Sequence, residues 1–244
     1  MELVSPFTLV YTYLRSPLSP LSFGTPPPLS IHNPSVVLAV LFLIHYANRA
    51  VLSPLRTPSR SKSHLIVVLA GILFNSVNGP LLGAYLSSPE CHSYLIGAYQ
   101  RPRFWFGILM WAAGFIGNIV HDEILLNIRR KKQVEDAKKS PEQLAKEKKR
   151  GEHYGIPHGL LYKYISFPNY FCEWIEWMGF ALAASPLPSF ESLELFLTTI
   201  TPPFLFFVAE ILTMVPRAVK GHQWYHAKFP NYPKERKIVV PFLV

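Results

Sequence analysis

The apolar residues of this chain collect in long runs that are separated by shorter polar segments. A helix needs about twenty mostly apolar residues to cross the hydrocarbon core of a bilayer, and several runs reach that length. The expected spans are residues 4–23, 35–53, 65–86, 104–120, 156–184 and 193–215. Prolines break the first run, so we expect an irregular helix there. The pattern predicts an all-α membrane protein with about six transmembrane helices, organised as one domain over residues 1–244.

Composition and charge agree with this class and set the orientation of the spans. Hydrophobic residues make up 50% of the chain and charged residues only 16%, which is unlike an ordinary soluble domain. The net charge of +9 comes from loops and the tail, so it does not indicate a nucleic-acid partner. Segment 129–153 holds ten Lys and Arg against five Asp and Glu, and we expect a solvated, partly helical cytosolic insertion there, with contact to anionic lipid head groups as the alternative. The tail after residue 216 and both chain ends are expected on the same cytosolic side.

The stretch 156–177 is apolar enough for a bilayer, yet it carries an amide and two carboxylates. Pro168 suits the first turn of a helix, where its missing N–H costs nothing. Counted from there at about 100° per residue, Asn169, Glu173 and Glu176 fall on one stripe. Such groups cost about 2–3 kcal/mol each when they face lipid, so they should face a protein interior or a wet cavity. Two interpretations stay open: a polar network that fixes helix packing, or a binding site.

Further polar residues gather where the expected spans meet the cytosol. These candidates are Asn118, Asp122, Arg129, Arg217, His222, Tyr225 and Arg236. The first three are spaced so that they return to one face of a helix. Arginines suit phosphates, while acids and amides suit ribose hydroxyls or a carboxamide, so the set fits a phosphate-bearing ligand; a buried salt-bridge network is the alternative. The sequence has no glycine-rich dinucleotide motif and no P-loop, and its two cysteines, Cys91 and Cys172, form no CxxC pair, so no metal site is expected.

Three segments of the chain resemble the steroid 5α-reductase family, in order and with fitting spacing. They are GNIVHDEILLNIRR, IPHGLLYKYISFPNYFCEWIEW and RAVKGHQWYHAKFPNYPKERKIVVPFLV. They follow the family patterns N-I-x-x-D-x-x-L-x-x-L-R, I-P-x-G-x-L-F-x-Y-V-S-x-x-N-x-x-x-E-x-x-E-W and H-x-x-Y-x-x-x-F-x-x-Y-P-x-x-R-K-x-x-x-P-F. Upstream, HYANRA at 45–50 is similar to the family element H-Y-x-x-R, and Asn78 and Gly79 with Gly83 to its N-G-x-x-x-G. The resemblance covers about residue 41 to the C-terminus.

The resemblance implies an NADPH-dependent membrane reductase. By this resemblance, the cofactor would be bound by Arg49, Asn118, Asp122, Arg129, Asn169, Glu173, Arg217, His222 and Tyr225. Tyr46 matches the family tyrosine that hydrogen-bonds the 3-keto oxygen of the substrate, and Glu2, in the segment MELVSP, matches its glutamate partner. The implied reaction reduces the C4–C5 double bond of a 3-oxo-Δ4 steroid, or of a similar conjugated enone lipid, by hydride transfer to the β-carbon. The implied location is the endoplasmic reticulum membrane, with membrane lipids around the protein and no obligate protein partner.

The chain also departs from the family pattern. The family has seven spans, one of them before the glutamate, so we expect that span to be missing here and the activity of this polypeptide alone to suffer. Gly159-Leu160 stands where Gly-Gly is usual, Phe167-Pro168 stands where Gly-Ala is usual, and segment 129–153 is longer than the usual connection. Two alternatives stay open: a trans-2-enoyl-CoA or polyprenal-type reductase, and a non-catalytic membrane protein that keeps only the cofactor half.

Overall fold

The computed structural model describes residues 1–18, 28–57, 64–139 and 155–243. Within these ranges the regular structure is helical, and the sole β-type pairing is an isolated bridge between Ile165 and Lys237. The expected all-α fold is confirmed. The elements are α1 (Val4–Arg15), α2 (Pro34–Tyr46), the π-helical turn η2 (Ala47–Leu52), α3 (Ser53–Arg56), α4 (Leu65–Leu86), α5 (Pro89–Leu95), the 3-10 turn η3 (Ala98–Gln100), α6 (Pro102–Asp136), the 3-10 turn η4 (Leu160–Lys163), α8 (Pro168–Ala184), α9 (Leu193–Thr199) and α10 (Pro202–Lys228).

Four helical segments are long and apolar enough to cross a membrane, which confirms the expected class of protein. They are Pro34–Arg56 (α2, η2 and α3 joined), Leu65–Leu86, Pro102–Asp136 and Pro202–Lys228. The other two expected spans, 4–23 and 156–184, contain shorter helices among the described residues: α1 has 12 residues and α8 has 17. The end of the first expected span, residues 19–23, lies outside the described residues.

The last expected span differs from expectation in its boundary. The last span does not begin at residue 193: α9 ends at Thr199, and α10 starts afresh at Pro202. Thr201, which precedes the proline, is extended at φ −91° and ψ 160°, as the proline ring requires of the residue before it. In contrast, α6 continues without a break to Asp136, so the start of segment 129–153 is helical as expected. Residues 140–153 of that segment lie outside the described residues.

The outward faces of the long helices are apolar. Leu69, Leu73 and Val77 on α4 each expose more than half of their surface, and so do Leu109 and Ile116 on α6. In water, contiguous exposed side chains of this kind would be unfavourable. In a bilayer they contact lipid tails, which are as apolar as leucine itself. The exterior of the bundle therefore suits a membrane, while its polar side chains point inward.

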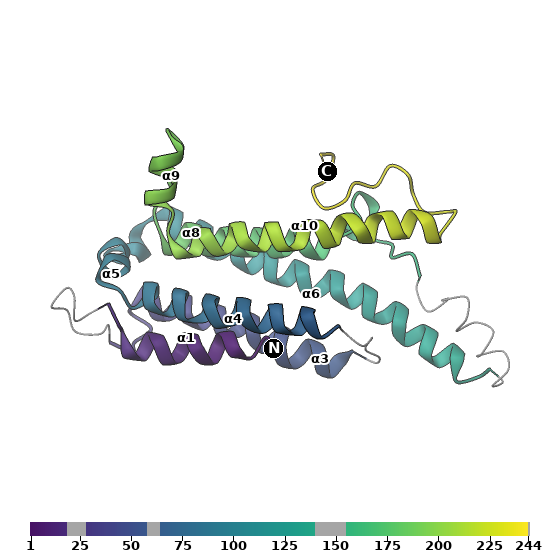
Figure 1. Cartoon of the computed structure of the whole chain (residues 1–244), viewed down its shortest axis with the longest axis horizontal. Helices are drawn as coiled ribbons and strands as arrows, with labels where there is room; N and C mark the ends of the chain where they lie inside the picture. Colours follow the sequence, from purple (N-terminus) through teal and green to yellow (C-terminus); the bar gives the residue numbers. More distant parts are fainter. Residues whose placement is uncertain (19–27, 58–63, 140–154, 244) are drawn as a thin grey trace.

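Two closely packed helix pairs, α1 with α4 and α6 with α8, frame the bundle (Figure 1). Glycines let the two backbones of each pair approach one another, as small residues do in membrane helices. A Cβ atom on Gly114 of α6 would lie within 3 Å of backbone atoms of Cys172 and Glu176 on α8. A Cβ atom on Gly79 of α4 would meet the backbone of Ser5 on α1 in the same way. Helices α2 and α10 each contact members of both pairs and so join them.

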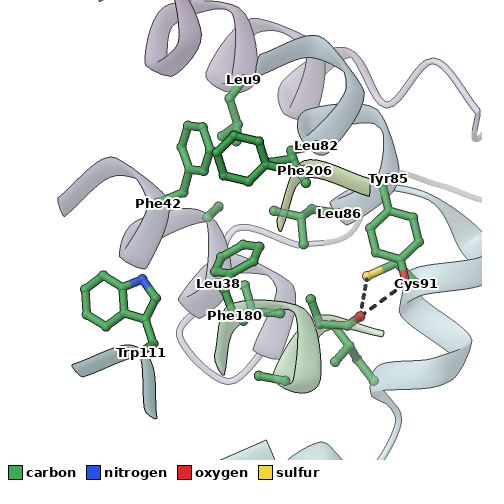
Figure 2. Packing of buried hydrophobic residues seen from close by; sticks show 14 of the residues in the cluster. Leu9, Leu38, Phe42, Leu82, Tyr85, Leu86, Cys91, Trp111, Phe180 and Phe206 are labelled. Atoms are coloured by element: carbon green, nitrogen blue, oxygen red, sulfur yellow. Dashed lines mark hydrogen bonds between the residues drawn. The ribbon is translucent and has the colours of Figure 1, made fainter. Parts of the chain in front are cut away.

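The hydrophobic core lies where α2 meets the two pairs (Figure 2). Leu38 and Phe42 of α2 are fully buried among Leu9 of α1, Leu82 of α4 and Phe180 of α8. Burial of these apolar side chains fixes α2 between the pairs. The polar residues at the C-terminal end of α2 are therefore held at a defined position in the bundle.

A second contact ties α4 and α5 to the end of α8 (Figure 2). The Tyr85 hydroxyl donates a hydrogen bond to the Ala184 carbonyl oxygen at 3.2 Å, and the Cys91 thiol approaches the same oxygen at 3.9 Å. Cys91 and Cys172 are both free and buried, as expected for a chain without a disulfide framework. These residues serve packing rather than chemistry.

Candidate functional site

A cavity of about 570 Å³ lies among the start of the chain, α2, η2, α4, α8 and α10. Its wall on α4 is largely apolar and includes Ile66, Val67, Ala70 and Phe74. Polar side chains from the other elements complete the lining. The sequence-predicted site residues brought together here are Glu2, Tyr46, Arg49, Glu173 and Arg217. The cavity thus offers an apolar surface for a lipid beside a concentrated set of hydrogen-bonding groups.

The polar stripe of α8 faces α2 and α6, so the stripe expected from helical spacing is real. Glu173 Oε2 accepts a hydrogen bond from the Asn118 side chain of α6 at 3.0 Å. Glu176 Oε1 lies 2.7 Å from His45 Nδ1 of α2, and this pair is buried. Glu176 is fully buried and joins helices, whereas Glu173 lines the cavity. The packing interpretation therefore fits Glu176, and the binding-site interpretation stays a prediction for Glu173.

Two amides extend this network along the α6–α8 pair. The Asn118 side chain also donates to the Asn169 carbonyl oxygen at 3.1 Å. In return, the Asn169 side chain donates to Asp122 Oδ1 at 3.0 Å. The expected stripe of α6 is thereby bonded to the first two turns of α8. Asp122 and Asn169 carry the network from Glu173 toward a second cavity.

The second cavity, of about 210 Å³, lies between α6, the start of α8 and α10. Arg129, Asn169 and Tyr225, all expected site residues, line it together with Ser166 and Phe167. Asn169 and Glu173 are one helical turn apart, so the smaller cavity and the larger one adjoin the same stretch of α8. The candidate residues thus form two adjoining compartments rather than one.

The C-terminal tail packs against the segment before α8, part of which lines the smaller compartment. Backbone bonds join the segment before α8 to the tail: Ser166 N–H donates to the Lys237 carbonyl at 2.9 Å, and Lys237 N–H donates to Tyr164 at 2.8 Å. The Ser166 hydroxyl lies 2.6 Å from His222 Nδ1 and accepts a hydrogen bond from the Tyr232 hydroxyl at 2.7 Å. His222, an expected site residue, is thereby fixed behind the cavity wall. The tail is part of the site architecture and not an appendage.

Arg236, the farthest of the candidate residues along the chain, lies in the tail and outside the linings of both cavities. It is buried, with its guanidinium over the Tyr232 ring at 5.0 Å and one nitrogen 3.4 Å from His158 Nδ1. Two other nitrogens of this guanidinium have no partner among the described residues. A buried guanidinium with spare donors is suited to an anionic ligand.

Tyr46, the last residue of α2, projects into the larger cavity. Its hydroxyl donates to Asn75 Oδ1 at 3.2 Å and lies 3.4 Å from the Asn78 side-chain nitrogen, both on α4. Arg49 follows within the π-helical turn η2, a rare helix form that often marks functional sites. Glu2 pairs with Arg49 at 3.6 Å, so in the described residues the bonding partners of Tyr46 are amides rather than Glu2.

Sequence reasoning missed several polar residues of this site. His45, Asn75 and Glu210 line the larger cavity and were not assigned to it, and Asn78 was noted only within a motif. A signal for Asn75 and Glu210 was available, because each is a polar residue inside an apolar run. His45 was visible only beside Tyr46, and nothing in the sequence paired it with Glu176.

Comparison with known proteins identifies the family of the chain. Residues 61–244 match the family described as 3-oxo-5-alpha-steroid 4-dehydrogenase. Uncharacterized protein C9.08c of Schizosaccharomyces pombe is 40% identical over 250 residues, covering 100% of this chain and 82% of that protein. The rat 3-oxo-5-alpha-steroid 4-dehydrogenase 1 is 34% identical over 212 residues, covering 86% of this chain and 68% of the enzyme. The tomato steroid 5-alpha-reductase DET2 is 34% identical over 221 residues, covering 86% and 70%. By the family match and these identities, the chain belongs to the 3-oxo-5-alpha-steroid 4-dehydrogenase family.

Proposed function

We propose that this protein is an oxidoreductase that reduces the C4–C5 double bond of a 3-oxo-Δ4 steroid, or of a similar conjugated enone lipid, with NADPH as the reductant. One observation carries the proposal: the Tyr46 hydroxyl lines a cavity that joins an apolar α4 wall to a polar compartment between α6 and α8. A lipid needs an apolar surface, whereas a phosphate-bearing cofactor needs charged and hydrogen-bonding groups. This arrangement offers both. The family relatives named as steroid reductases support the same activity.

The donor set of the two compartments fits NADPH. Arg129 and Arg217 provide guanidinium groups suited to phosphates, one in each compartment. Asn169 Oδ1 is buried without a hydrogen-bond partner among the described residues, so it is an acceptor that a bound amide or hydroxyl would satisfy. Glu173 and Asp122 are acceptors suited to ribose hydroxyls. Glu173, Asn169 and the two arginines would hold the cofactor, which supplies a hydride when bound.

Tyr46 would act on the substrate carbonyl. Its hydroxyl can donate a hydrogen bond to the enone oxygen, where negative charge develops as the β-carbon is reduced. Asn78 orients that hydroxyl from α4 at 3.4 Å, and burial of Tyr46 at 5% exposure keeps competing water away. In the free protein the hydroxyl donates its hydrogen bond to Asn75 Oδ1. A substrate oxygen would replace Asn75 as the acceptor of that bond.

Glu2 and Arg49 form the second polar pair beside Tyr46. Their 3.6 Å ion pair keeps a carboxylate at the cavity wall, where it can share a proton with the tyrosine as substrate binds. The guanidinium of Arg49 balances the charge of that carboxylate. The α-carbon would then take its proton from solvent, which completes saturation of the C4–C5 bond. In this scheme Glu2 orients and shares a proton with Tyr46 and does not touch the reacting carbons.

The endoplasmic reticulum membrane is the proposed location, with the C-terminus in the cytosol. Arg56, after the second expected span, forms an ion pair with Glu123 of α6, and Arg130 of α6 pairs with the same carboxylate. Arg56 and Arg130 therefore lie at one end of the bundle, as a positive-inside orientation needs of these two positions. Tags placed in the tail and in segment 129–153 of sealed microsomes should both be open to external protease; protection of either tag contradicts the orientation.

The proposed activity is tested directly with purified protein. NADPH consumption is followed with a 3-oxo-Δ4 steroid, a trans-2-enoyl-CoA and a polyprenal in parallel, and products are identified by mass spectrometry. Reduction of the steroid at C4–C5 is the expected result. Reduction of only the enoyl-CoA or the polyprenal would show that the substrate is not a steroid, although the reaction is still the reduction of a conjugated double bond. NADPH binding without turnover of any enone would instead indicate a non-catalytic protein.

A further inference from the structure

Glu210 lines the larger cavity from α10, and the scheme above gives it no task. It stands seven residues before Arg217, so both side chains lie on one face of α10. Along the helix axis the two positions differ by about 10 Å. Arg217 is nearer than Glu210 to Tyr225, the residue of α10 that lines the smaller compartment.

The bonding of Glu210 differs from that of the other acids around this cavity. Glu2 pairs with Arg49, and Glu173 accepts a hydrogen bond from Asn118. The carboxyl group of Glu210 has no direct hydrogen-bond or ion-pair partner in the described part of the chain. A carboxylate in a membrane interior is costly unless a donor satisfies it. A ligand in the cavity can supply the hydrogen-bond donor that this carboxyl group lacks.

The surroundings of Glu210 limit what that donor can be. Glu210 lines the same cavity as Tyr46 and Arg49, so one ligand can contact all three side chains. Arg49 and Arg217 offset the charges of Glu2 and Glu173 in the lining, and the α4 wall is largely apolar, so a mainly apolar ligand suits the cavity. A neutral donor on a largely apolar molecule fits best, and a hydroxyl group is the simplest such donor.

We propose that Glu210 is a specificity-determining residue whose carboxylate accepts a hydrogen bond from a hydroxyl group on the enone lipid. The preferred substrate is then a hydroxylated enone lipid rather than a wholly apolar one. This inference rests on the proposed function, because it assigns the cavity to an enone substrate.

The test compares one 3-oxo-Δ4 steroid with a panel of its singly hydroxylated isomers. The wild-type protein should show a kcat/KM about 10- to 100-fold higher for one isomer than for the parent, as a hydrogen bond to a charged group provides. Glu210→Leu should remove that preference, and Glu210→Gln should keep part of it, because the amide oxygen still accepts. Glu194→Gln on α9, an exposed acid outside the cavity, is the control and should leave the preference unchanged.

Three results would overturn the inference. The first is a wild-type protein that prefers no hydroxylated isomer. The second is a preference that survives in Glu210→Leu. The third is an equal loss for parent and isomers together with weaker NADPH binding, which would assign the carboxylate to the cofactor instead.

Binding separates this inference from the proposed function. Thermal stabilisation of the protein by the same steroids is measured for wild type and Glu210→Leu. A wild-type protein that reduces no enone contradicts the proposed function. Stronger stabilisation by one hydroxylated isomer, lost in Glu210→Leu, would then still support the role of Glu210, and its absence would overturn it.

Discussion

The helix pairs α6–α8 and α1–α4 are built alike but hold their polar groups differently. In both pairs a glycine lets the backbones touch, Gly114 in the first and Gly79 in the second. Across α6–α8, side-chain hydrogen bonds of 3.0 Å fix two acids, Glu173 and Asp122. On the α1–α4 side, the bonds that reach Tyr46 are longer, at 3.2 and 3.4 Å.

This difference matches the two tasks of the proposed reaction. A cofactor has one shape, so its acceptors can be fixed in advance by hydrogen bonds between closely packed helices. A lipid substrate varies and must displace existing contacts, so its side of the cavity is mostly apolar and its tyrosine is less tightly bonded. The comparison predicts that changes on the α1–α4 side act on turnover, while changes on α6–α8 act on cofactor binding and stability.

The largest effect should follow Tyr46→Phe, which keeps the ring and removes the hydroxyl. Loss of one donor to the developing enolate oxygen should lower kcat about 10²- to 10³-fold, with NADPH affinity nearly unchanged. Steady-state reduction of a 3-oxo-Δ4 steroid measures kcat, and a separate NADPH titration measures the affinity for the cofactor. Tyr85→Phe, which removes a buried tyrosine hydroxyl outside the cavity, is the matched control. A Tyr46→Phe protein within about threefold of wild type would leave Tyr46 as a packing residue.

Next in size should be Arg129→Ala on the cofactor side. Removing a charged hydrogen bond to a phosphate should weaken NADPH binding by about 1.5–3 kcal/mol, measured by calorimetric titration. Arg130→Ala is the neighbouring control, because Arg130 pairs with Glu123 instead of lining the cavity. Equal affinity losses in the two variants would point to overall charge rather than a phosphate contact.

A somewhat smaller effect, on stability rather than on cofactor affinity, is expected when a glycine between α6 and α8 is replaced. The Cβ of Gly114→Ala would meet backbone atoms of α8, which cannot move aside, and should lower the free energy of unfolding by about 1–3 kcal/mol. Gly117→Ala meets only the Cys172 side chain and should cost less. Denaturation in detergent ranks the two variants. A reversed ranking would show that the backbones of α6 and α8 are less closely packed than described.

The smallest effect should come from Asn78→Ala, which removes one long hydrogen bond to Tyr46. This bond is long, at 3.4 Å, so the loss should be about 0.5–1.5 kcal/mol in kcat/KM, and the assay of enone reduction detects it. If this variant loses as much activity as Tyr46→Phe, the orientation of the hydroxyl depends on Asn78 alone. The inference that Tyr46 is only weakly bonded on this side would then be wrong.

Much of the α6–α8 side could be predicted from the sequence, because regular helices turn spacing into geometry. Asn169, Glu173 and Glu176 were placed on one face by rotation alone, and Pro168 correctly marked the start of α8. The polar extension of α6 beyond its apolar run was also expected. In each case a single helix decides which residues share a face, so no knowledge of the tertiary structure is needed.

The rest depends on contacts between elements that no local pattern encodes. The pairing of His45 with Glu176, and of Glu2 with Arg49, joins residues from different helices. The π-helical turn after Tyr46 has no sequence signal that we could read. Glu210 was overlooked because one acid in an apolar run says little until a cavity is seen beside it.

The central claim is that this cavity brings a nicotinamide cofactor and an enone lipid together. The most direct measurement uses NADPH carrying deuterium at the transferred position, with a 3-oxo-Δ4 steroid and the purified protein. Mass spectrometry and NMR then locate the deuterium in the product. The account predicts one deuterium at the β-carbon, C5, and an ordinary solvent-derived hydrogen at C4. Deuterium at the carbonyl carbon, or a product without deuterium, would contradict it.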